Sequence, residues 1–146
     1  YVDELEKKLP AGLRSRITYS PAVQRDQSAL INGSIIDAVR RRDLLSAYPD
    51  DSMDLFLGLL REASFSDKVS EIRITIYRLA SNPRIADYLI YAARSGKKVR
   101  VVLELRARFD EERNLAWADR LAAAGCRVYF GTDKYKVHSK MCQIVL

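Results

Sequence analysis

From about residue 68 onward, the chain alternates between short runs rich in β-branched residues and longer segments with the character of helices. The strand candidates are residues 71–79 (EIRITIYRL), 98–105 (KVRVVLEL) and 127–130 (RVYF). Between them lie two helix candidates, which span about 82–95 and 110–124. β-Branched residues suit the pleated surface of a sheet, and strands that alternate with helices are joined by right-handed crossovers into a parallel sheet. The pattern predicts an α/β fold with a mixed, largely parallel sheet flanked by helices.

Both helix candidates begin with residues that favour a helix start. Asn82 is a candidate N-cap and is followed by Pro83, which is well tolerated in a first turn. Asp110 is the candidate cap of the second helix, whose first turn carries Glu111 and Glu112. Carboxylates in that position interact favourably with the helix dipole. We therefore expect helices to begin close to residues 82 and 110.

The beginning of the chain is less regular. Residues 1–9 could form a short helix that ends at Pro10, and residues 14–32 are polar and irregular. Two more helices are expected, one over 34–45 with Asn32 as its cap, and one over 52–64.

This change of pattern suggests a domain boundary near residue 50. We expect residues 1–50 to be a helical and irregular linker from a preceding region. Residues 51–146 are then expected to form one domain, truncated at its carboxyl end. Because the chain opens on Tyr1 and stops within an expected final strand, we also expect it to be a fragment of a larger protein.

The composition of the chain limits the compartments and the kinds of partner that fit it. The 146 residues are 48% hydrophobic, which is enough to bury a core, but no apolar stretch approaches the ~20 residues that would cross a bilayer. Cys126 and Cys142 lack the spacing of a metal site and are typical of buried thiols in a reducing compartment. We expect a cytoplasmic location, with peripheral membrane association left open. The net charge of +6 favours a polyanionic partner without choosing between nucleic acid, membrane and phosphate ligands.

Cationic residues follow the predicted strands. Ligands of open parallel sheets bind outside the carboxyl ends of the strands. The cationic residues that follow these ends are Arg78, Arg106, Arg108, Lys134 and Lys136. A helix that begins near Asn82 would add backbone N–H groups at the same edge. Arg108 could instead be partly neutralised by the acidic run after it, and Glu104 could either pair with a cation or face water. The chain has no G-x-G-x-x-G or Walker A sequence, so ATP would have to be held in another way.

The only histidine of the chain lies in the sequence KVHSK, residues 136–140, at the start of the final apolar run 141–146. If this segment is a strand, His138 and Lys140 project to one side while Ser139 points away. A neutral imidazole nitrogen can attack phosphorus, and an ammonium group offsets charge on the phosphate oxygens. A short H-x-K match also fits a lone structural histidine, so this motif alone leaves both interpretations open.

Several segments, in order along the chain, resemble bacterial polyphosphate kinases over about residues 33–146. RDLL (42–45) and YPDDS (48–52) are similar to the family's R-D-x-L and P-Y-x-S-F, and IYR (76–78) is similar to its T-L-Y-R. ELRARFDEE (104–112), with Asn114 and Trp117, is similar to E-L-x-A-R-F-D-E-E-x-N-x-x-W. KVHSK is similar to K-x-H-A-K. The ARFDEE run is much more specific than H-x-K.

The resemblance implies a phospholipase-D-like domain, which this family uses twice in each chain. It also implies that His138 is the phosphohistidine nucleophile, assisted by Lys140. Arg78 and Arg108 would line the phosphate and magnesium site, and because a guanidinium cannot ligate a cation, their contact with Mg²⁺ would run through phosphate oxygens. The phospholipase D pattern expects an aspartate where Val145 stands. Polyphosphate kinases also lack this aspartate, so its absence argues against a lipase or nuclease.

These observations predict part of a polyphosphate kinase that reversibly transfers the γ-phosphate of ATP to inorganic polyphosphate. The expected partners are ATP or ADP, Mg²⁺, polyphosphate, the remaining domains of the enzyme and a second copy of the full-length chain, but no nucleic acid. We expect the fragment alone to be inactive. One alternative is a phospholipase-D-like phosphodiesterase that uses the same histidine on nucleic acid or lipid without ATP. Another is a non-catalytic module that binds polyanions, in which His138 is structural.

Overall fold

A computed structural model of the chain describes residues 2–17, 23–27, 31–79, 83–106, 111–132 and 134–146. The helices are α1 (Val2–Lys8), α2 (Ala11–Ile17), α3 (Ile35–Arg41), α4 (Asp54–Phe65), α5 (Arg84–Arg94) and α6 (Glu111–Ala123). The strands are β1 (Glu71–Ile76), β2 (Lys98–Leu103), β3 (Arg127–Phe130) and β4 (Cys142–Val145). The alternation of strands and helices from β1 onward is as predicted.

The four strands form one mixed sheet in the order β3-β2-β1-β4. Strands β1, β2 and β3 are parallel to one another, whereas β4 is antiparallel to β1. The prediction of a largely parallel α/β sheet is confirmed. Because β4 runs in the opposite direction, its beginning lies at the edge where the other three strands end. This topology brings the residues before β4 to the carboxyl edge of the parallel strands.

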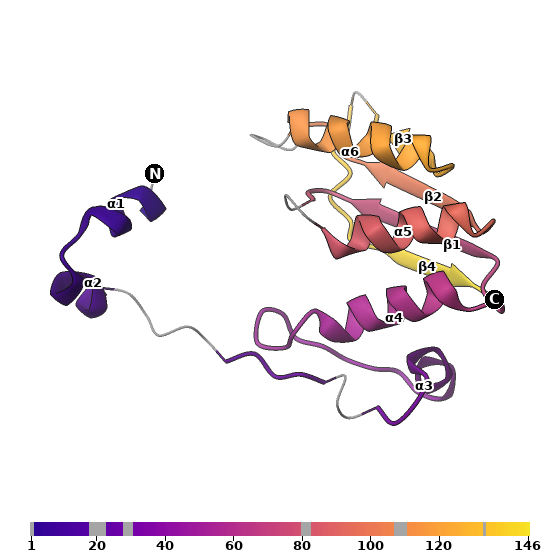
Figure 1. Cartoon of the computed structure of the whole chain (residues 1–146), viewed down its shortest axis with the longest axis horizontal. Helices are drawn as coiled ribbons and strands as arrows, with labels where there is room; N and C mark the ends of the chain where they lie inside the picture. Colours follow the sequence, from indigo (N-terminus) through magenta and orange to yellow (C-terminus); the bar gives the residue numbers. More distant parts are fainter. Residues whose placement is uncertain (1, 18–22, 28–30, 80–82, 107–110, 133) are drawn as a thin grey trace.

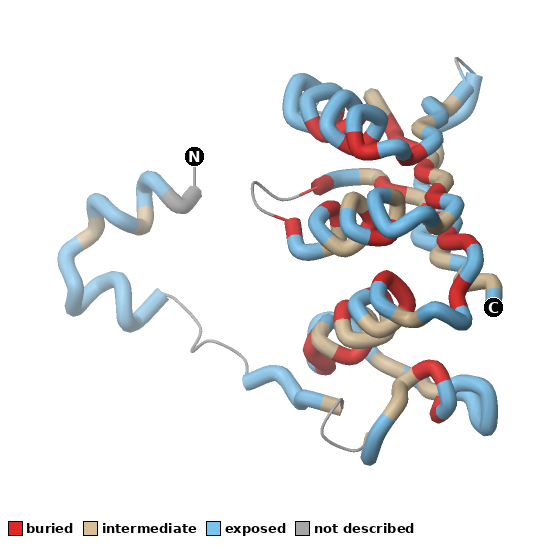
Figure 2. The backbone as a smooth tube through the Cα atoms, turned by 45° about the vertical axis from the view of Figure 1, so that its right-hand side comes forward, coloured by how far each residue is buried: buried red, intermediate tan, exposed pale blue. Residues whose placement is uncertain are grey.

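The core lies between the sheet and the helices α4, α5 and α6 (Figure 2). On β1, alternate residues Ile72 and Ile74 are buried on this side, while Arg73 between them is exposed. The helices contribute fully buried leucines to the same core, among them Leu60, Leu89 and Leu121. Burying such a side chain stabilises a fold by roughly 1.5–3 kcal/mol. The helices therefore cover one face of the sheet and leave its edges to carry loops.

Helix α3 begins later and ends earlier than the sequence suggested. Its N-cap is Ser34 instead of Asn32, and the Ser34 hydroxyl accepts a hydrogen bond of 3.0 Å from the backbone N–H of Asp37. The carboxylate of Glu62 in α4 also accepts a hydrogen bond of 2.7 Å from the first backbone N–H of the helix, that of Ile35. A cap supplied by a neighbouring helix cannot be read from local sequence.

The amino-terminal helices α1 and α2 lie apart from the rest of the chain (Figure 1). They are joined by an ion pair of 2.9 Å between Arg14 and Glu6. The prediction of an irregular chain from residue 14 is wrong as far as Ile17, because the carbonyl of Pro10 accepts hydrogen bonds from the backbone N–H groups of Leu13 and Arg14. Pro10 thus begins α2 as well as ending α1, which fits its preset φ angle.

A buried aspartate, Asp51, binds residues of the expected linker through hydrogen bonds and an ion pair. Asp51 is 1% exposed and accepts hydrogen bonds from the Gln27 side chain (2.8 Å) and the backbone N–H of Ala47 (2.6 Å). It also forms an ion pair of 2.9 Å with Arg25. The hydrogen bond from Ala47 and the charge of Arg25 hold the pKa of Asp51 below its ordinary value, although burial opposes this. The domain boundary near residue 50 stays a prediction.

The two cysteines are free thiols, and burial raises the pKa of each to about 11. Within the described ranges, no helix is both long enough and apolar enough to cross a bilayer.

Candidate functional site

The candidate site lies at the carboxyl edge of the parallel strands. Three segments meet there: the end of β1 with Tyr77 and Arg78, the turn after β2 with Glu104 and Arg106, and residues 134–140 before β4. This is the edge at which open α/β sheets bind ligands. The antiparallel direction of β4, which the sequence did not reveal, is what places His138 beside the residues that follow β1.

His138 and Lys140 both contact the aromatic ring of Tyr77. The ring centroids of His138 and Tyr77 are 4.9 Å apart, with an edge-on angle of 78° between the rings. The Lys140 ammonium lies 5.0 Å from the Tyr77 centroid and donates a hydrogen bond of 2.5 Å to the backbone carbonyl of His138. The predicted convergence of the two side chains is therefore present in the structure.

The local structure of these residues differs from the prediction. His138 and Lys140 precede β4, which begins only at Cys142. The segment is held by Thr75 of β1, whose hydroxyl donates a hydrogen bond of 2.8 Å to the Ser139 carbonyl and accepts one of 2.9 Å from the backbone N–H of Met141. The backbone N–H of Thr75 also donates a hydrogen bond of 2.9 Å to the Met141 carbonyl, so main chain and side chain of Thr75 together hold the segment before β4.

Arg78 reaches the same ring from the end of β1. Its guanidinium carbon lies 5.4 Å from the Tyr77 centroid, and its side chain is exposed. Three predicted site residues, Arg78, His138 and Lys140, therefore surround one aromatic ring. The fourth, Arg108, lies outside the described residues, as do the predicted cap residues Asn82 and Asp110.

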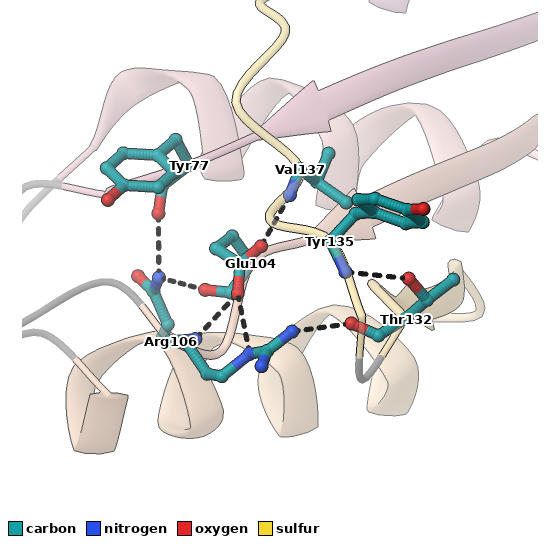
Figure 3. A network of polar contacts seen from close by, with 7 residues as sticks. Tyr77, Glu104, Arg106, Thr132, Tyr135 and Val137 are labelled. Atoms are coloured by element: carbon teal, nitrogen blue, oxygen red, sulfur yellow. Dashed lines mark hydrogen bonds and ion pairs between the residues drawn. The ribbon is translucent and has the colours of Figure 1, made fainter.

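Arg106 lies at the predicted edge and contacts other residues of the protein there. Its guanidinium donates a hydrogen bond of 2.6 Å to the carbonyl of Thr132 and lies 4.0 Å from the carboxylate of Glu104 (Figure 3). Arg106 thus links the turn after β2 to the loop after β3. Lys134 and Lys136 are exposed on that loop. They are the cations of the loop whose side chains are open to a ligand in solution.

Glu104 joins the turn after β2 to the segment that leads to His138 (Figure 3). It is 2% exposed and accepts hydrogen bonds from the backbone N–H groups of Arg106 (2.8 Å) and Val137 (2.5 Å). Burial opposes its ionisation, but these two hydrogen bonds and the charges of Arg106 and Lys136 hold its pKa below the ordinary value. The question left open by the sequence is answered: Glu104 is paired and does not face water.

Asn114 of α6 joins the ends of the first two strands. Its side-chain amide donates hydrogen bonds of 2.9 Å to the backbone carbonyls of Tyr77 and Glu104. The residue is fully buried. Residue-by-residue reasoning gave Asn114 no role, although a buried amide in an amphipathic helix is a recognisable signal, because it must find partners.

Replacing Asn114 with alanine is expected to lower the free energy of unfolding by about 2–3 kcal/mol, because two buried carbonyls lose their donor. Urea unfolding followed by circular dichroism measures this change. The matched control is Glu112→Ala, at an exposed position of the same helix, which is expected to change stability by less than about 0.5 kcal/mol. Equal effects of the two substitutions would show that the amide does not hold the strand ends together.

The described residues of the site suit phosphate oxygens better than a metal ion. They include no group of three or more His, Cys, Asp or Glu residues that could hold a metal. The side chains around Tyr77 are an imidazole, an ammonium and a guanidinium, and the last two cannot ligate Mg²⁺. Such cations do bind phosphate, through charge-assisted hydrogen bonds. The geometry thus provides a nucleophilic nitrogen beside groups that neutralise an anion.

Comparison with known proteins identifies the same relationship over most of the chain. The sequence model of polyphosphate kinase C-terminal domain 1 matches residues 34–146. The chain is 49% identical over 116 residues to polyphosphate kinase of Escherichia coli K12, a match that covers 80% of this chain and 17% of that protein. It is 46% identical over 114 residues to polyphosphate kinase of Campylobacter jejuni, which covers 78% of this chain and 16% of that protein.

A solved structure agrees with these matches. The crystal structure of polyphosphate kinase from Porphyromonas gingivalis superimposes with a TM-score of 0.73 at 40% identity. The match covers 93% of this chain and 23% of the other. The chain therefore spans less than a quarter of the length of the relatives that it matches.

Proposed function

The chain belongs to the polyphosphate kinase family, and on that basis we propose that it forms part of an enzyme that transfers the γ-phosphate of ATP reversibly to inorganic polyphosphate through a phosphohistidine at His138. The observation that carries this proposal is the convergence of His138, Lys140 and Arg78 on one ring at the carboxyl edge of the sheet. A nucleophile with flanking cations is the arrangement that phosphoryl transfer requires.

In the proposed reaction, the neutral imidazole of His138 attacks the γ-phosphorus of ATP, the bond to the bridging oxygen breaks, and ADP leaves. Lys140, Arg78 and Arg108 stabilise the charge on the equatorial oxygens. The terminal phosphate of polyphosphate then attacks phosphorus and releases the imidazole. When bound with the nucleotide, Mg²⁺ would supply positive charge that offsets the charge of the phosphate oxygens.

The proposal extends to the rest of the enzyme. The matched relatives are several times longer than this chain. We take residues 51–146 as the first of two phospholipase-D-like domains, working with the remaining domains in a cytoplasmic homo-oligomer. The isolated chain is then inactive, because ATP contacts and the second domain come from elsewhere.

The test is to label the polyphosphate kinase that carries this segment. The enzyme is incubated with γ-labelled ATP and Mg²⁺, and acid-labile, alkali-stable phosphate is mapped by mass spectrometry. We expect the label on His138, and we expect added polyphosphate to remove it. Since His138 is the only histidine of the chain, a labelled peptide from this region is unambiguous.

Other outcomes would contradict the proposal. A folded enzyme that incorporates no label at His138 would place the nucleophile outside this chain. Label that appears on His138 from a phosphodiester, with no requirement for ATP, would identify a phosphodiesterase. Polyanion binding that follows salt concentration alone, and that is unchanged in the His138→Ala variant, would identify a binding module.

A further inference from the structure

The ring of Tyr77 contacts all three candidate site residues, His138, Lys140 and Arg78. We propose that Tyr77 is a positioning residue, whose aromatic ring holds His138, Lys140 and Arg78 in the arrangement used for phosphoryl transfer. This inference rests on the function proposed above. It assigns no chemical step to Tyr77, which acts through the three residues that it contacts.

The contacts are of the kind that an aromatic ring makes and an aliphatic side chain does not. The face of an aromatic ring is negative and its edge is positive. Lys140 lies over the Tyr77 ring at 5.0 Å and Arg78 at 5.4 Å, both within the ~6 Å at which a cation is attracted to the ring. His138 packs edge-on at 4.9 Å. One ring therefore contacts two like charges and the imidazole.

The ring is also held on a rigid element. Tyr77 follows β1 directly and is half-buried, and its backbone carbonyl accepts the hydrogen bond of 2.9 Å from the buried Asn114. The preceding strand pairs with β2 on one side and β4 on the other. A catalytic arrangement retains its geometry when supporting residues are fixed in this way. His138 and Lys140, by contrast, lie on a segment outside the regular strand and depend on side-chain contacts.

Two substitutions distinguish the contribution of the Tyr77 ring from that of its hydroxyl group and from that of apolar packing. Tyr77→Phe keeps the ring, whereas Tyr77→Leu keeps an apolar side chain without it. In the polyphosphate kinase that carries this segment, we expect Tyr77→Phe to form the phosphoenzyme within about threefold of the parent rate. We expect Tyr77→Leu to be slower by roughly 30–100-fold, the scale of a misplaced reacting group, with the KM for ATP changed by less than about threefold.

The matched control is Tyr91→Leu. Tyr91 lies near the end of α5 and packs on Phe65 with a centroid distance of 4.0 Å. The Tyr91→Leu variant loses an aromatic contact, as Tyr77→Leu does, but in a part of the fold away from the candidate site. We expect Tyr91→Leu to keep the parent rate, so that a general loss of packing is distinguished from a loss of positioning.

A second measurement does not depend on activity. Because the chain has a single histidine, the ring protons of His138 can be assigned by NMR in the chain itself. We expect Tyr77→Leu to shift these resonances by removal of the ring current, and Tyr77→Phe to leave them near their original positions. Unchanged resonances in Tyr77→Leu would show that the two rings are not in contact.

The proposal is overturned if Tyr77→Leu keeps the phosphorylation rate of the parent enzyme. It is also overturned if Tyr77→Phe is as slow as Tyr77→Leu, because the hydroxyl group would then be responsible. These outcomes are distinct from failure of the proposed function, which would show as absence of label on His138 in the unsubstituted enzyme.

Discussion

Replacing His138 with asparagine is expected to reduce polyphosphate synthesis by about 1,000-fold or more, because asparagine has no nucleophilic ring nitrogen to form a covalent intermediate. Assays with ATP and Mg²⁺, on the polyphosphate kinase that carries this segment, measure this loss as a change in kcat. The phosphoenzyme should be absent as well. The side chain of His138 is exposed and packs edge-on against one ring, so the substitution is expected to leave the fold intact.

The control for His138→Asn lies in the strand that follows. Gln143 of β4 is exposed and accepts a hydrogen bond of 3.2 Å from Arg73. Gln143→Ala therefore alters the same part of the chain without touching the candidate site, and we expect it to retain activity. If His138→Asn kept more than about a tenth of the parent rate, a covalent route through His138 would be contradicted, because another residue would then have to act as the nucleophile.

The order of strands and helices could be predicted because it depends on local patterns of apolar and β-branched residues. Ile72 and Ile74 mark a strand with one buried face, and the expected strand over 127–130 coincides with β3. The part that Glu62 plays in capping α3 could not be predicted, since this residue comes from another helix. Nor could the direction of β4, which depends on tertiary pairing with β1.

The candidate site was predictable to a similar extent. The rule for parallel sheets placed Arg78 at the carboxyl edge, and the alternation of residues put His138 and Lys140 on one side of their segment; the structure brings all three to one ring. The same rule placed Arg106 at this edge, and the structure shows its guanidinium bonded to the carbonyl of Thr132. A rule about strand ends gives the position of a side chain but not its partner. The partners of Arg106 come from loops whose approach depends on the whole fold.

These partners explain how loops at a sheet edge can hold a fixed geometry. The turn after β2, the loop after β3 and the segment before β4 lie outside the regular strands. Glu104 connects the turn after β2 to the segment before β4 through Val137, and Arg106 connects the same turn to the loop after β3 through Thr132. Val137 immediately precedes His138. The position of the candidate nucleophile therefore depends on a buried carboxylate that does not take part in the proposed chemistry.

Replacing Glu104 with glutamine is expected to lower the free energy of unfolding at pH 7 by roughly 2–4 kcal/mol. The carboxylate accepts hydrogen bonds on both oxygens, from the backbone N–H groups of Arg106 and Val137. In glutamine an NH₂ group replaces one of the two oxygens. This hydrogen-bond donor then faces one of the two backbone N–H groups inside a buried site, where neither has an acceptor. Urea unfolding of the chain, followed by fluorescence of its single tryptophan, Trp117, measures the loss.

The effect should depend on pH in a defined direction. The pKa of Glu104 in the folded chain lies below its ordinary value of 4.5. A carboxyl group with a lowered pKa contributes stability at pH values above its unfolded pKa, and this contribution is lost as the pH falls through the folded pKa. The difference between the parent chain and Glu104→Gln should therefore be largest at neutral pH and shrink as the pH falls below 4.5.

Two comparisons decide whether the charge of Glu104 is responsible. Asp119→Asn removes the same charge from an exposed position of α6 and is expected to change stability by less than about 0.5 kcal/mol. If Glu104→Gln were destabilised by a constant amount from pH 7 to pH 3, the effect would come from packing and not from ionisation. If it had no effect at all, the carboxylate would not be what joins the loops, and another contact would have to hold Val137 and His138 in place.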